Sequence, residues 1–484
     1  MLPSVSIFKS DGNTGVVKPS ADGILAIIAP SQHGTPNQPG AFARRDLALA
    51  EHGFGPLVEV AAYHMDVAGK PVVLIRSAAS TAATAGTVTT TGGGTATHTV
   101  ATPANILDDF DILITYGNGG TQGVAGITYT TSLDGGLTNS PFQALGTATS
   151  LTIPNSGVTV DVGAGTILPG QKVSFSTKGP RSTNADLVDA LEALRTYGGA
   201  WSDLLVVAEA DATMVATLDL WLSAREAEGK FKTFVANAVP RDAATQTEAQ
   251  YATAMTAAFG SASSIRGCVC ADQGYVVSSL RGIRMRRPVS IGFAARGMAS
   301  DISRDAAFVA DGPIAGYQIA DDRGNPLFHD EALYPGLDDL RLTTLRSFHG
   351  REGTFITNPL LLSPSGSDYV FWQHARVMNK ACDIAFQLLT NRLSQGVRKD
   401  RATGFILEED AQEIEALVQA ELDKQLVTPG RVSGAVFLLS RTDDLSSNAG
   451  AVLNAEIQVS ALAYVKRFAV TSKFVKRIVV PPAA

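Results

Sequence analysis

The sequence predicts a mixed α+β protein with several domains, and three observations support that fold class. The chain has 484 residues, whereas a single hydrophobic core rarely grows beyond about 300 residues. Apolar residues make up 45% of the chain and charged residues 18%, so large cores can be buried. Short alternating segments fill residues 79–179, and helical patterns alternate with strand patterns from residue 180 onward.

Residues 1–78 are expected to contain an arm and the first part of a core domain. Two continuous apolar runs in this part are typical of buried strands, which are covered on both faces. The expected elements, in chain order, are an alternating arm at Val5 and Ile7, a buried strand at 24–29, two short helices within 41–67 and a second buried strand at 72–75.

Residues 79–179 are expected to form an inserted β-sandwich or barrel domain. No charged residue occurs from Ser77 to Leu107, and short runs rich in Ile, Val, Thr and Tyr follow at 111–116, 126–131, 150–153, 158–162 and 172–175. The glycines after Tyr116 resemble a nucleotide loop, but a strand follows them instead of a helix, so a hairpin turn is the preferred interpretation. We expect this domain to fold independently, with its two ends close together.

Residues 180–345 are expected to form an α/β domain. Thr183 or Asn184 is a typical helix cap. Helices then alternate with continuous apolar strands, which indicates a parallel sheet covered by helices. The expected helices are 184–197, 212–228 and 246–259, and the expected strands are 204–208, 231–236 and 267–271.

Residues 346–484 are expected to complete the core domain and to end in a second arm. Helices are predicted at 368–394 and 407–426, and strands at 431–441, 453–466 and 473–480. The last strand and the N-terminal arm have no evident hairpin partner, so both are candidates for addition to the sheet of another subunit. For 473–480, a third strand within the same chain is the alternative. The residues assigned to strand exchange are Val5, Ile7, Phe474, Val475, Ile478 and Val480.

The charge balance and the cysteine content argue against several classes of protein. The chain carries 39 Lys and Arg against 46 Asp and Glu, a formal net charge of -7. Nucleic-acid and membrane-surface binders normally carry a basic excess, so we expect no nucleic-acid partner. No apolar stretch of membrane-spanning length occurs, so no stable membrane insertion is expected. Three cysteines, Cys268, Cys270 and Cys382, are too few for a disulfide framework and fit a reducing cytoplasm.

No sequence pattern predicts a catalytic residue, a metal ligand or a cofactor, so we expect no enzyme. Phosphate-binding loops, zinc-binding helices and nucleophile elbows do not occur. Cys268 and Cys270 face the same side of a strand, but no second Cys or His pair stands at ligand spacing, so buried apolar residues are the preferred interpretation. The seven histidines are scattered, and for His374 a surface or capped histidine is preferred over a general base. The acidic pairs Asp321-Asp322 and Asp330-Glu331 are typical of caps and turns.

A basic cluster stands out in the α/β segment. It consists of Arg281, Arg284, Arg286 and Arg287. Contact with an acidic partner and a solvated loop are two equally supported interpretations.

Three stretches resemble the tail sheath family of contractile phage tails and related injection systems. Residues 23–76 contain a Gly-led strand, a loop that ends in Asn37-Gln-Pro, a short helix that ends in Phe54-Gly and a closing strand. Residues 287–317 contain a Pro-led strand with a small-residue helix, and residues 346–393 contain a Gly-containing strand with the long helix. The N-terminus departs from the family, because Leu2-Pro-Ser-Val-Ser-Ile replaces the usual Pro-Gly-Val-Tyr opening.

The resemblance implies a sheath-type core of mixed α/β architecture, built from both chain ends, with an inserted all-β domain and an inserted α/β domain. It implies a structural subunit that polymerises as helical rings around a tail tube and contracts to drive the tube through a bacterial envelope, without a cofactor. The implied partners are further copies of the chain in a helical homo-oligomer, the tail tube protein, and the baseplate and tail terminator proteins. The implied location is the virion tail, assembled in the cytoplasm of the host bacterium.

The tube-facing surface is expected in the core domain, around the helix at 407–426, although a solvated charged face is the alternative. The candidate tube contacts are Arg398, Lys399, Arg401, Glu413 and Glu415. The sequence is also compatible with two other functions. One is a different self-assembling virion or shell protein. The other is an enzyme whose ligand binds at the carboxyl ends of the parallel strands, near Glu209, Asn237 and Asp272.

Overall fold

The computed structural model describes residues 22–242, 245–320, 327, 336–364, 366–446 and 452–470. The chain divides into two compact units, with the boundary between Leu393 and Ser394. The described residues of each unit mix helices with sheets, as the predicted fold class requires. Within the described residues, none of the helices combines the length and the apolar character needed to cross a bilayer.

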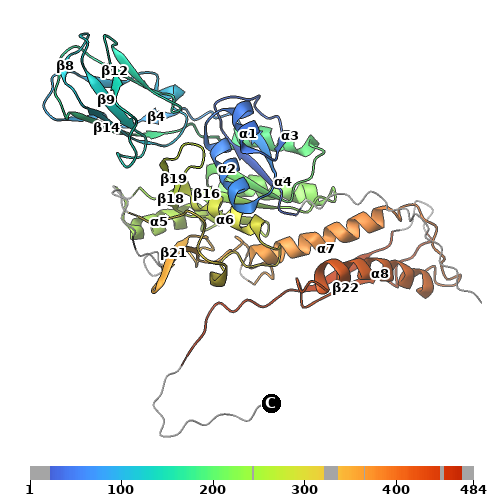
Figure 1. The fold of residues 1–484 in the computed structure, drawn as a ribbon. Helices are drawn as coiled ribbons and strands as arrows, with labels where there is room; N and C mark the ends of the chain where they lie inside the picture. Colours follow the sequence, from blue (N-terminus) through green and yellow to red (C-terminus); the bar gives the residue numbers. More distant parts are fainter. Residues whose placement is uncertain are drawn as a thin grey trace, which may run out of the picture. The chain divides into compact units, whose positions relative to one another are not determined.

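A six-stranded sheet forms the centre of the first unit (Figure 1). Its strand order is β17 (Gly267–Cys270), β16 (Thr233–Ala238), β15 (Asp203–Ala210), β1 (Leu25–Ala29), β3 (Val72–Arg76) and β2 (Gly40–Phe42). The first five strands are parallel, and β2 runs antiparallel to β3. Every residue of β1 and β16 is buried, which fits the continuous apolar sequence of β1 and the largely apolar sequence of β16, where Thr233 and Asn237 are the polar residues.

The strand order corrects one of the expected domain groupings. Residues 1–78 were expected to pair with 346–484 in a core domain apart from the α/β domain at 180–345. Instead β1 lies between β3 and β15, with Ile27 beside both Leu74 and Leu205. The N-terminal strands and the α/β strands therefore share one sheet. A buried strand has an apolar sequence whichever strand lies next to it. The sequence pattern therefore does not predict the order of the strands in the sheet.

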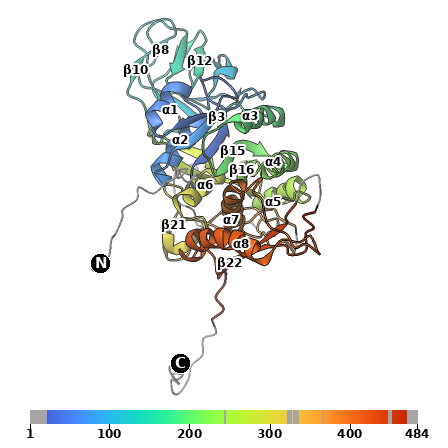
Figure 2. The same ribbon diagram turned by 90° about the vertical axis from the view of Figure 1, so that its right-hand side faces the viewer.

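Helices cover both faces of this sheet (Figure 2). The helices α3 (Asn184–Thr196), α4 (Ala212–Glu226) and α5 (Glu248–Phe259) bury apolar side chains against one face. The helices α2 (Pro56–Ala68), α6 (Val289–Ala299) and the start of α7 (Trp372–Thr390) pack on the other face. A short helix α1 (Arg45–His52) precedes α2. The predicted cap of α3 is confirmed, since the Thr183 hydroxyl accepts a hydrogen bond from the backbone of Asp186.

Residues 79–179, which we call the β module, contain eleven short strands and one turn of 3-10 helix (η1, Pro103–Asn105). The strands are β4 (Thr84–Ala85), β5 (Thr89–Thr91), β6 (His98–Val100), β7 (Asp111–Tyr116), β8 (Gly120–Thr121), β9 (Thr128–Ser132), β10 (Gln143–Ala144), β11 (Ser150–Ile153), β12 (Val158–Val162), β13 (Thr166–Ile167) and β14 (Lys172–Lys178). The antiparallel pairing of β7 with β9 confirms the predicted hairpin. Thr81 and Arg181 exchange backbone hydrogen bonds of 3.1 and 3.0 Å, so the two ends of the β module are adjacent, as expected.

Two further hairpins complete the described part of the first unit. The strands β18 (Gln273–Val277) and β19 (Arg284–Pro288) form one, and β20 (Leu345–Phe348) and β21 (Arg351–Ile356) form the other. A short 3-10 helix, η2 (Val309–Asp311), lies between them in sequence. The acidic pairs predicted as caps, Asp321-Asp322 and Asp330-Glu331, lie outside the described residues.

The second unit contains one helix and one hairpin within its described residues. The helix α8 (Glu408–Leu422) continues into a π-helical turn, η4 (Asp423–Val427), and then come the antiparallel strands β22 (Gly434–Leu439) and β23 (Ala455–Ser460). Ala411, Ile414, Val418 and Leu422 of α8 are buried, as their helical spacing predicts. The residues assigned to strand exchange, Val5, Ile7, Phe474, Val475, Ile478 and Val480, lie outside the described residues.

Candidate functional site

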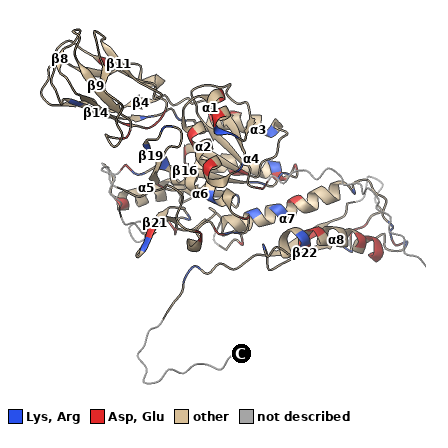
Figure 3. Ribbon diagram, in the orientation of Figure 1, with Lys and Arg blue, Asp and Glu red and all other residues tan. Residues whose placement is uncertain are grey.

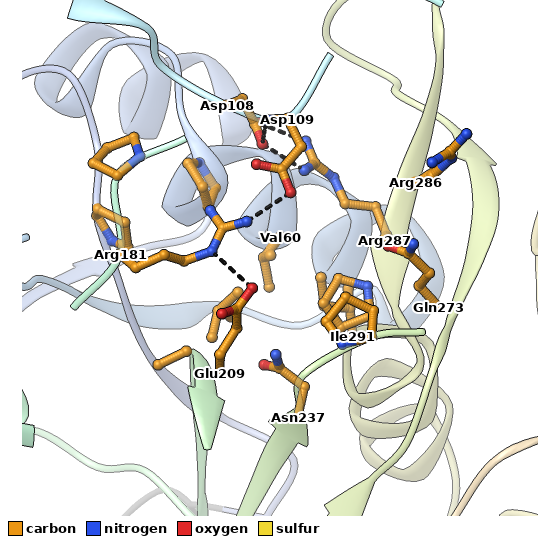
Figure 4. Close-up of a pocket in the computed structure, with 17 residues that line it drawn as sticks. Val60, Asp108, Asp109, Arg181, Glu209, Asn237, Gln273, Arg286, Arg287 and Ile291 are labelled. Atoms are coloured by element: carbon orange, nitrogen blue, oxygen red, sulfur yellow. Dashed lines mark hydrogen bonds and ion pairs between the residues drawn. The ribbon is translucent and has the colours of Figure 1, made fainter. Parts of the chain in front are cut away.

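The carboxyl edge of the sheet is where an enzyme with this fold would bind its ligand. The chain proceeds from β1 to β3 in one direction and from β15 through β16 to β17 in the other, so the strand order reverses between β1 and β15. Open α/β sheets bind ligands at such a point. A pocket of about 40 Å³ lies there, lined among others by Pro30, Glu209 and Asn237 (Figure 4). The sequence therefore located this edge correctly.

Side chains from the segments that attach the β module occupy this position. The Arg181 guanidinium pairs with the Asp109 carboxylate at 2.6 Å and with the Glu209 carboxylate at 3.5 Å (Figure 4). This pocket is large enough for a few water molecules only. A neighbouring pocket of about 190 Å³ shares Asp109, Arg181 and Glu209 with it, and both are smaller than the usual ligand pockets of about 300 to 1,000 Å³. Asp272, the third candidate, does not line the pocket. It occupies a left-handed turn, where its backbone N–H donates to the Tyr251 hydroxyl at 2.9 Å.

A buried ion pair lies beside this pocket. Arg287 donates from both terminal nitrogens to the two carboxylate oxygens of Asp108, each at 2.8 Å. Both side chains are almost completely buried. Burial opposes ionisation of Asp108, but the charge and hydrogen bonds of Arg287 outweigh it, and the pKa of Asp108 is lowered. The pair therefore links β19 to the β module as two charged groups.

Arg281 makes a second link between the β module and the helices. Its side chain and that of Glu59 on α2 are each 4% exposed, and its Nε donates to Glu59 at 2.8 Å. A terminal nitrogen donates to the backbone carbonyl of Asn155 in the β module at 2.6 Å. The guanidinium also lies over the rings of Phe54 and Phe110, 4.6 and 5.1 Å from their centres. Arg281 is thus held by α2 and by the β module together.

The hairpin β18–β19 supplies apolar contact as well. Met285 is 3% exposed and belongs to the hydrophobic core of the β module, with Ile283 packed against that core. On either side of Met285, Arg286 pairs with Asp111 at 3.3 Å and the Arg284 guanidinium lies 3.6 Å from the centre of the Tyr275 ring. The core of the β module is therefore completed from outside residues 79–179, which argues against its expected independence.

We call this set the arginine junction; it comprises Arg181, Arg281, Arg284, Arg286 and Arg287 with the carboxylates Glu59, Asp108, Asp109, Asp111 and Glu209. Four of its members are the basic cluster found in the sequence. The side chains of Arg281 and Arg287 are buried, so the interpretation of the cluster as a solvated loop is wrong for these two residues. Their acidic partners lie in the same chain, on α2 and the β module. The sequence missed them because Glu59 and Asp108 are more than 150 residues away.

Asp186 ties the start of the β module to α3. Its carboxylate accepts hydrogen bonds from the backbone and hydroxyl of Ser80, at 2.9 and 2.7 Å, and from the backbone of Thr183 at 2.8 Å. Burial opposes ionisation, but these hydrogen bonds prevail and lower the pKa of Asp186 to about 2.

The lowered pKa of Asp186 predicts an acid-dependent loss of stability. Because the folded-state pKa lies below the ordinary value of 3.8, the contribution is present above that value and is lost as the pH falls toward 2. We expect the melting temperature of Asp186→Asn to lie below that of the native chain at pH 6 and to approach it near pH 2. Thermal melts at a series of pH values measure this. A constant difference between the two proteins across that range would contradict the assignment.

The candidate tube contacts occupy the second unit, and one of them has an internal role. Glu415 pairs with Arg441 at 2.8 Å and accepts a hydrogen bond from the backbone of Leu439 at 2.7 Å. The Arg441 hydrogen bonds lower the pKa of Glu415. Glu415 therefore connects α8 to β22, and we no longer propose it as a tube contact. The amphipathic pattern of the sequence does not show that this carboxylate points toward the neighbouring strand.

The other candidate tube contacts are more exposed. Arg398 is 62% exposed in its side chain and pairs with Asp410 at 2.6 Å and Glu409 at 2.9 Å. Arg401 and Glu413 are exposed. The Lys399 ammonium donates to the Ser446 hydroxyl at 3.4 Å. These four residues stay candidates for contact with a partner.

The cysteines and histidines do not form a site in the described part of the chain. Cys268 and Cys270 are buried in β17, as predicted, and burial raises the pKa of Cys270. Burial also raises the pKa of Cys382 to about 11. No group of three or more potential metal ligands occurs among the described residues.

The solved structures that are similar to this chain include the following three. A sheath tail protein of Desulfitobacterium hafniense shares 13% identity, with 95% of this chain and 100% of that chain covered and a TM-score of 0.48. A sheath tail protein of Listeria innocua shares 14% identity, with 91% and 96% covered and a TM-score of 0.45. A chain of the anti-feeding prophage baseplate in its contracted state shares 13% identity, with 98% of both chains covered and a TM-score of 0.50.

The fold of this chain is sheath-like, as the sequence resemblance predicted. A model of the DUF2586 N-terminal domain matches residues 2–359. The chain therefore belongs to the DUF2586 family. No curated protein matches the sequence.

Proposed function

We propose that this protein is the structural subunit of a contractile tail sheath. Subunits polymerise as helical rings around a tail tube, and the polymer contracts to drive the tube through a bacterial envelope. The observation that carries the proposal is the similarity in fold to a chain of a contracted baseplate, over 98% of both chains. The partners are further copies of the chain, the tail tube protein, and the baseplate and tail terminator proteins. The assembly forms in the cytoplasm of the host bacterium and becomes part of the virion tail.

The arginine junction supports a structural role over an enzymatic one. In an enzyme with this fold the carboxyl edge between β1 and β15 would stay open to a ligand. Here Arg181 and Glu209 fill that edge with an ion pair of the chain's own. The same contacts fix the β module to the sheet. The energy of contraction would come from changes in packing between subunits.

Negative-stain electron microscopy of the purified full chain tests the proposal. Striated cylinders of uniform diameter are the expected result, alone or with the tube protein present. Closed shells would show the alternative, a different self-assembling virion protein. Discrete particles at high protein concentration, with or without the tube protein, would contradict the proposal.

Strand exchange between subunits is part of the proposed assembly. Within its described residues the second unit offers two paired strands and the helix α8, so an edge of this small sheet is available to a further strand. After β23 the chain leads away from the hairpin (Figure 1), and Val465, Phe468 and Val470 are 68%, 82% and 88% exposed. A segment that leaves its own hairpin in this way favours exchange over a third strand in the same chain. The arms at Val5, Ile7 and 473–480 would then join neighbouring subunits by main-chain hydrogen bonds.

The charged residues of the second unit, coloured along the ribbon in Figure 3, provide a test of tube contact. We expect Arg401→Glu combined with Glu413→Lys to weaken binding to tube protein several-fold while cylinders still form, because both side chains are exposed and the net charge is unchanged. Co-sedimentation with tube protein at low salt, where charge pairs are least screened, measures this. A matched control exchanges Arg44 and Asp46, an exposed pair of the first unit. Undiminished tube binding by the first variant would show that this face is solvated.

A further inference from the structure

A pocket beside α2 reaches the size of a usual ligand site. Its volume is about 300 Å³, at the lower end of the range of about 300 to 1,000 Å³ that such sites have. It lies in the first unit, where α2, α6 and the hairpin β18–β19 meet (Figure 1). We call it the α2 groove, and the apolar and aromatic residues that line it include Val60, Tyr63, Val67, Val276, Val277 and Ile291.

The α2 groove offers apolar surface to solvent. Val60, Val276 and Ile291 are buried, whereas Val277 on the same groove is 61% exposed. The Tyr63 hydroxyl already donates to the carbonyl of Ala315 at 2.7 Å, so this side chain presents its ring. An open groove of this kind fits apolar side chains of a peptide segment.

Three charged residues of the described chain line the α2 groove, and Asp66 is the exposed one. Glu59 and Arg287 are buried in the arginine junction. The Asp66 side chain is 41% exposed and accepts from Arg45 on α1 at 3.1 Å. Asp66 also lies in the last turn of α2, where the carbonyl end of the helix adds negative potential. This end of the groove therefore favours a positively charged occupant.

The described chain begins close to this end of α2. Residues 1–21 lie outside the described residues. The Lys70 ammonium donates to the backbone carbonyl of Asp22 at 3.5 Å, so Asp22 lies beside the residues that follow α2. Val67 is three residues before Lys70 and Val60 is ten residues before it. At about 1.5 Å per residue, the groove extends from about 5 to about 15 Å from Lys70 along the helix.

We propose that Val16 and Val17 bind in the α2 groove of their own chain and that Lys18 pairs with Asp66. Val16 and Val17 are the large apolar residues between Phe8 and Ile24. An extended chain places Val17 up to about 17 Å from Asp22, and Val16 up to about 20 Å, so both reach the groove. Lys18 then comes nearer to Asp22, at the end of the groove where Asp66 lies.

Charge distinguishes this segment from another one outside the described residues. Residues 328–335 carry the acids Asp330 and Glu331, which Asp66 would repel. Residues 16–18 of a second copy have the same chemistry as those of the same chain. The short distance from Asp22 to the groove favours the same chain, because a linked segment is present at a high effective concentration.

Docking at Val17 would shorten the free part of the N-terminal arm. Ile7 is fifteen residues from Asp22 and ten residues from Val17, so the reach of Ile7 falls from about 50 to about 34 Å. In the proposed assembly the arm would then meet only a subunit within that shorter distance of the α2 groove. This consequence rests on the proposed function, whereas the binding of Val16 and Val17 does not.

Disulfide formation in the purified full chain, kept monomeric at low concentration, tests the proposal. Cys382→Ser removes the half-buried native cysteine, and Cys268 and Cys270 stay because both are fully buried. One cysteine is then introduced by Val17→Cys or, for the neighbouring register, by Val16→Cys. Cysteine is a small apolar side chain, so it keeps most of the packing of valine.

The second cysteine is placed in the groove by Val277→Cys or, as the matched control, on α1 by Leu47→Cys. Leu47 is 53% exposed and lies two residues from Arg45, the partner of Asp66, so it is similarly accessible. We expect the bond within one chain to form at least about 10-fold faster with Val277→Cys, because docking holds the two thiols at bonding distance. Lys18→Glu should slow this bond roughly 2- to 5-fold, as for an exposed ion pair, and Lys9→Glu should not.

Each other outcome overturns a stated part of the proposal. Equal rates with Val277→Cys and Leu47→Cys, or no bond from either Val16→Cys or Val17→Cys, would show that the segment does not bind in the α2 groove. Bonds between chains would show that a second copy occupies it. An unchanged rate in Lys18→Glu would refute the pairing with Asp66. Because the chain is monomeric in this experiment, none of these results depends on whether it forms cylinders.

Discussion

Replacing Asp108 by Ala is expected to lower the free energy of unfolding by about 3 to 5 kcal/mol, because the buried guanidinium of Arg287 then loses its partner. Arg287 donates two hydrogen bonds of 2.8 Å to Asp108, and both side chains are almost completely buried. The two residues therefore form a buried ion pair. Denaturant unfolding of the native and variant chains measures the change.

Two variants give this experiment its controls. Asp161→Ala removes an exposed carboxylate of β12 in the same β module, and we expect a change of at most about 0.5 kcal/mol. Asp108→Leu combined with Arg287→Met removes both charges and should recover much of the lost stability, since apolar pairs often replace buried ion pairs without cost. Equal losses for Asp108→Ala and Asp161→Ala would show that the pair does not hold the β module.

Deletion of the β module would remove several partners of the arginine junction. Met285 would lose its apolar surroundings, and Arg287 would be left buried or newly exposed without Asp108. A deletion variant that only joins residues 78 and 180 with a Gly-Ser linker would therefore leave Met285 and Arg287 without their partners. The chain ends at Thr81 and Arg181 are close enough for such a linker, but Met285→Ser and Arg287→Ser have to accompany it.

Local elements were predictable from the sequence because local physics decides them. The cap at Thr183, the apolar stripe of α8 and the hairpin after Tyr116 follow from side-chain chemistry and periodicity within a few residues. The observed boundaries differ by a few residues, as in α7, which begins at Trp372 and not at Asp368. One short strand, β2, was expected to begin a helix, and its antiparallel pairing with β3 overrides the local pattern.

Long-range pairing was not predictable from these patterns. Leu205 beside Ile27 and Arg287 beside Asp108 join residues separated by 178 and 179 positions. The arginines themselves were visible as a cluster, but an arginine on a strand looks the same whether it faces water or a buried carboxylate. Gln419 was missed for the same reason, since its hydrogen bond to the carbonyl of Ala435 depends on the position of β22. Each of these contacts follows from the order of strands and helices in space.

Truncation after Phe468 is expected to leave a folded, soluble monomer that no longer forms cylinders. An added strand of eight residues directs about four residues at its neighbour, and each makes two main-chain hydrogen bonds, so about eight bonds form. At about 0.5 to 1.5 kcal/mol each, these contribute about 4 to 12 kcal/mol per contact. Since 1.4 kcal/mol is a factor of ten, the critical concentration for assembly should rise by roughly 700-fold or more.

Sedimentation across a range of protein concentrations, with electron microscopy of the pellets, measures the effect of the truncation. A control truncation after Pro482 removes only Ala483 and Ala484 and should assemble like the full chain, because 473–480 is retained. Far-UV circular dichroism and the melting temperature of the longer truncation should match those of the monomeric full chain, since the removed segment would pair outside its own subunit. Normal cylinders from the chain truncated after Phe468 would refute strand exchange by this arm. Insoluble protein would instead indicate that 473–480 is a third strand of its own hairpin, because its removal would expose the apolar face of Ile457 and Val459.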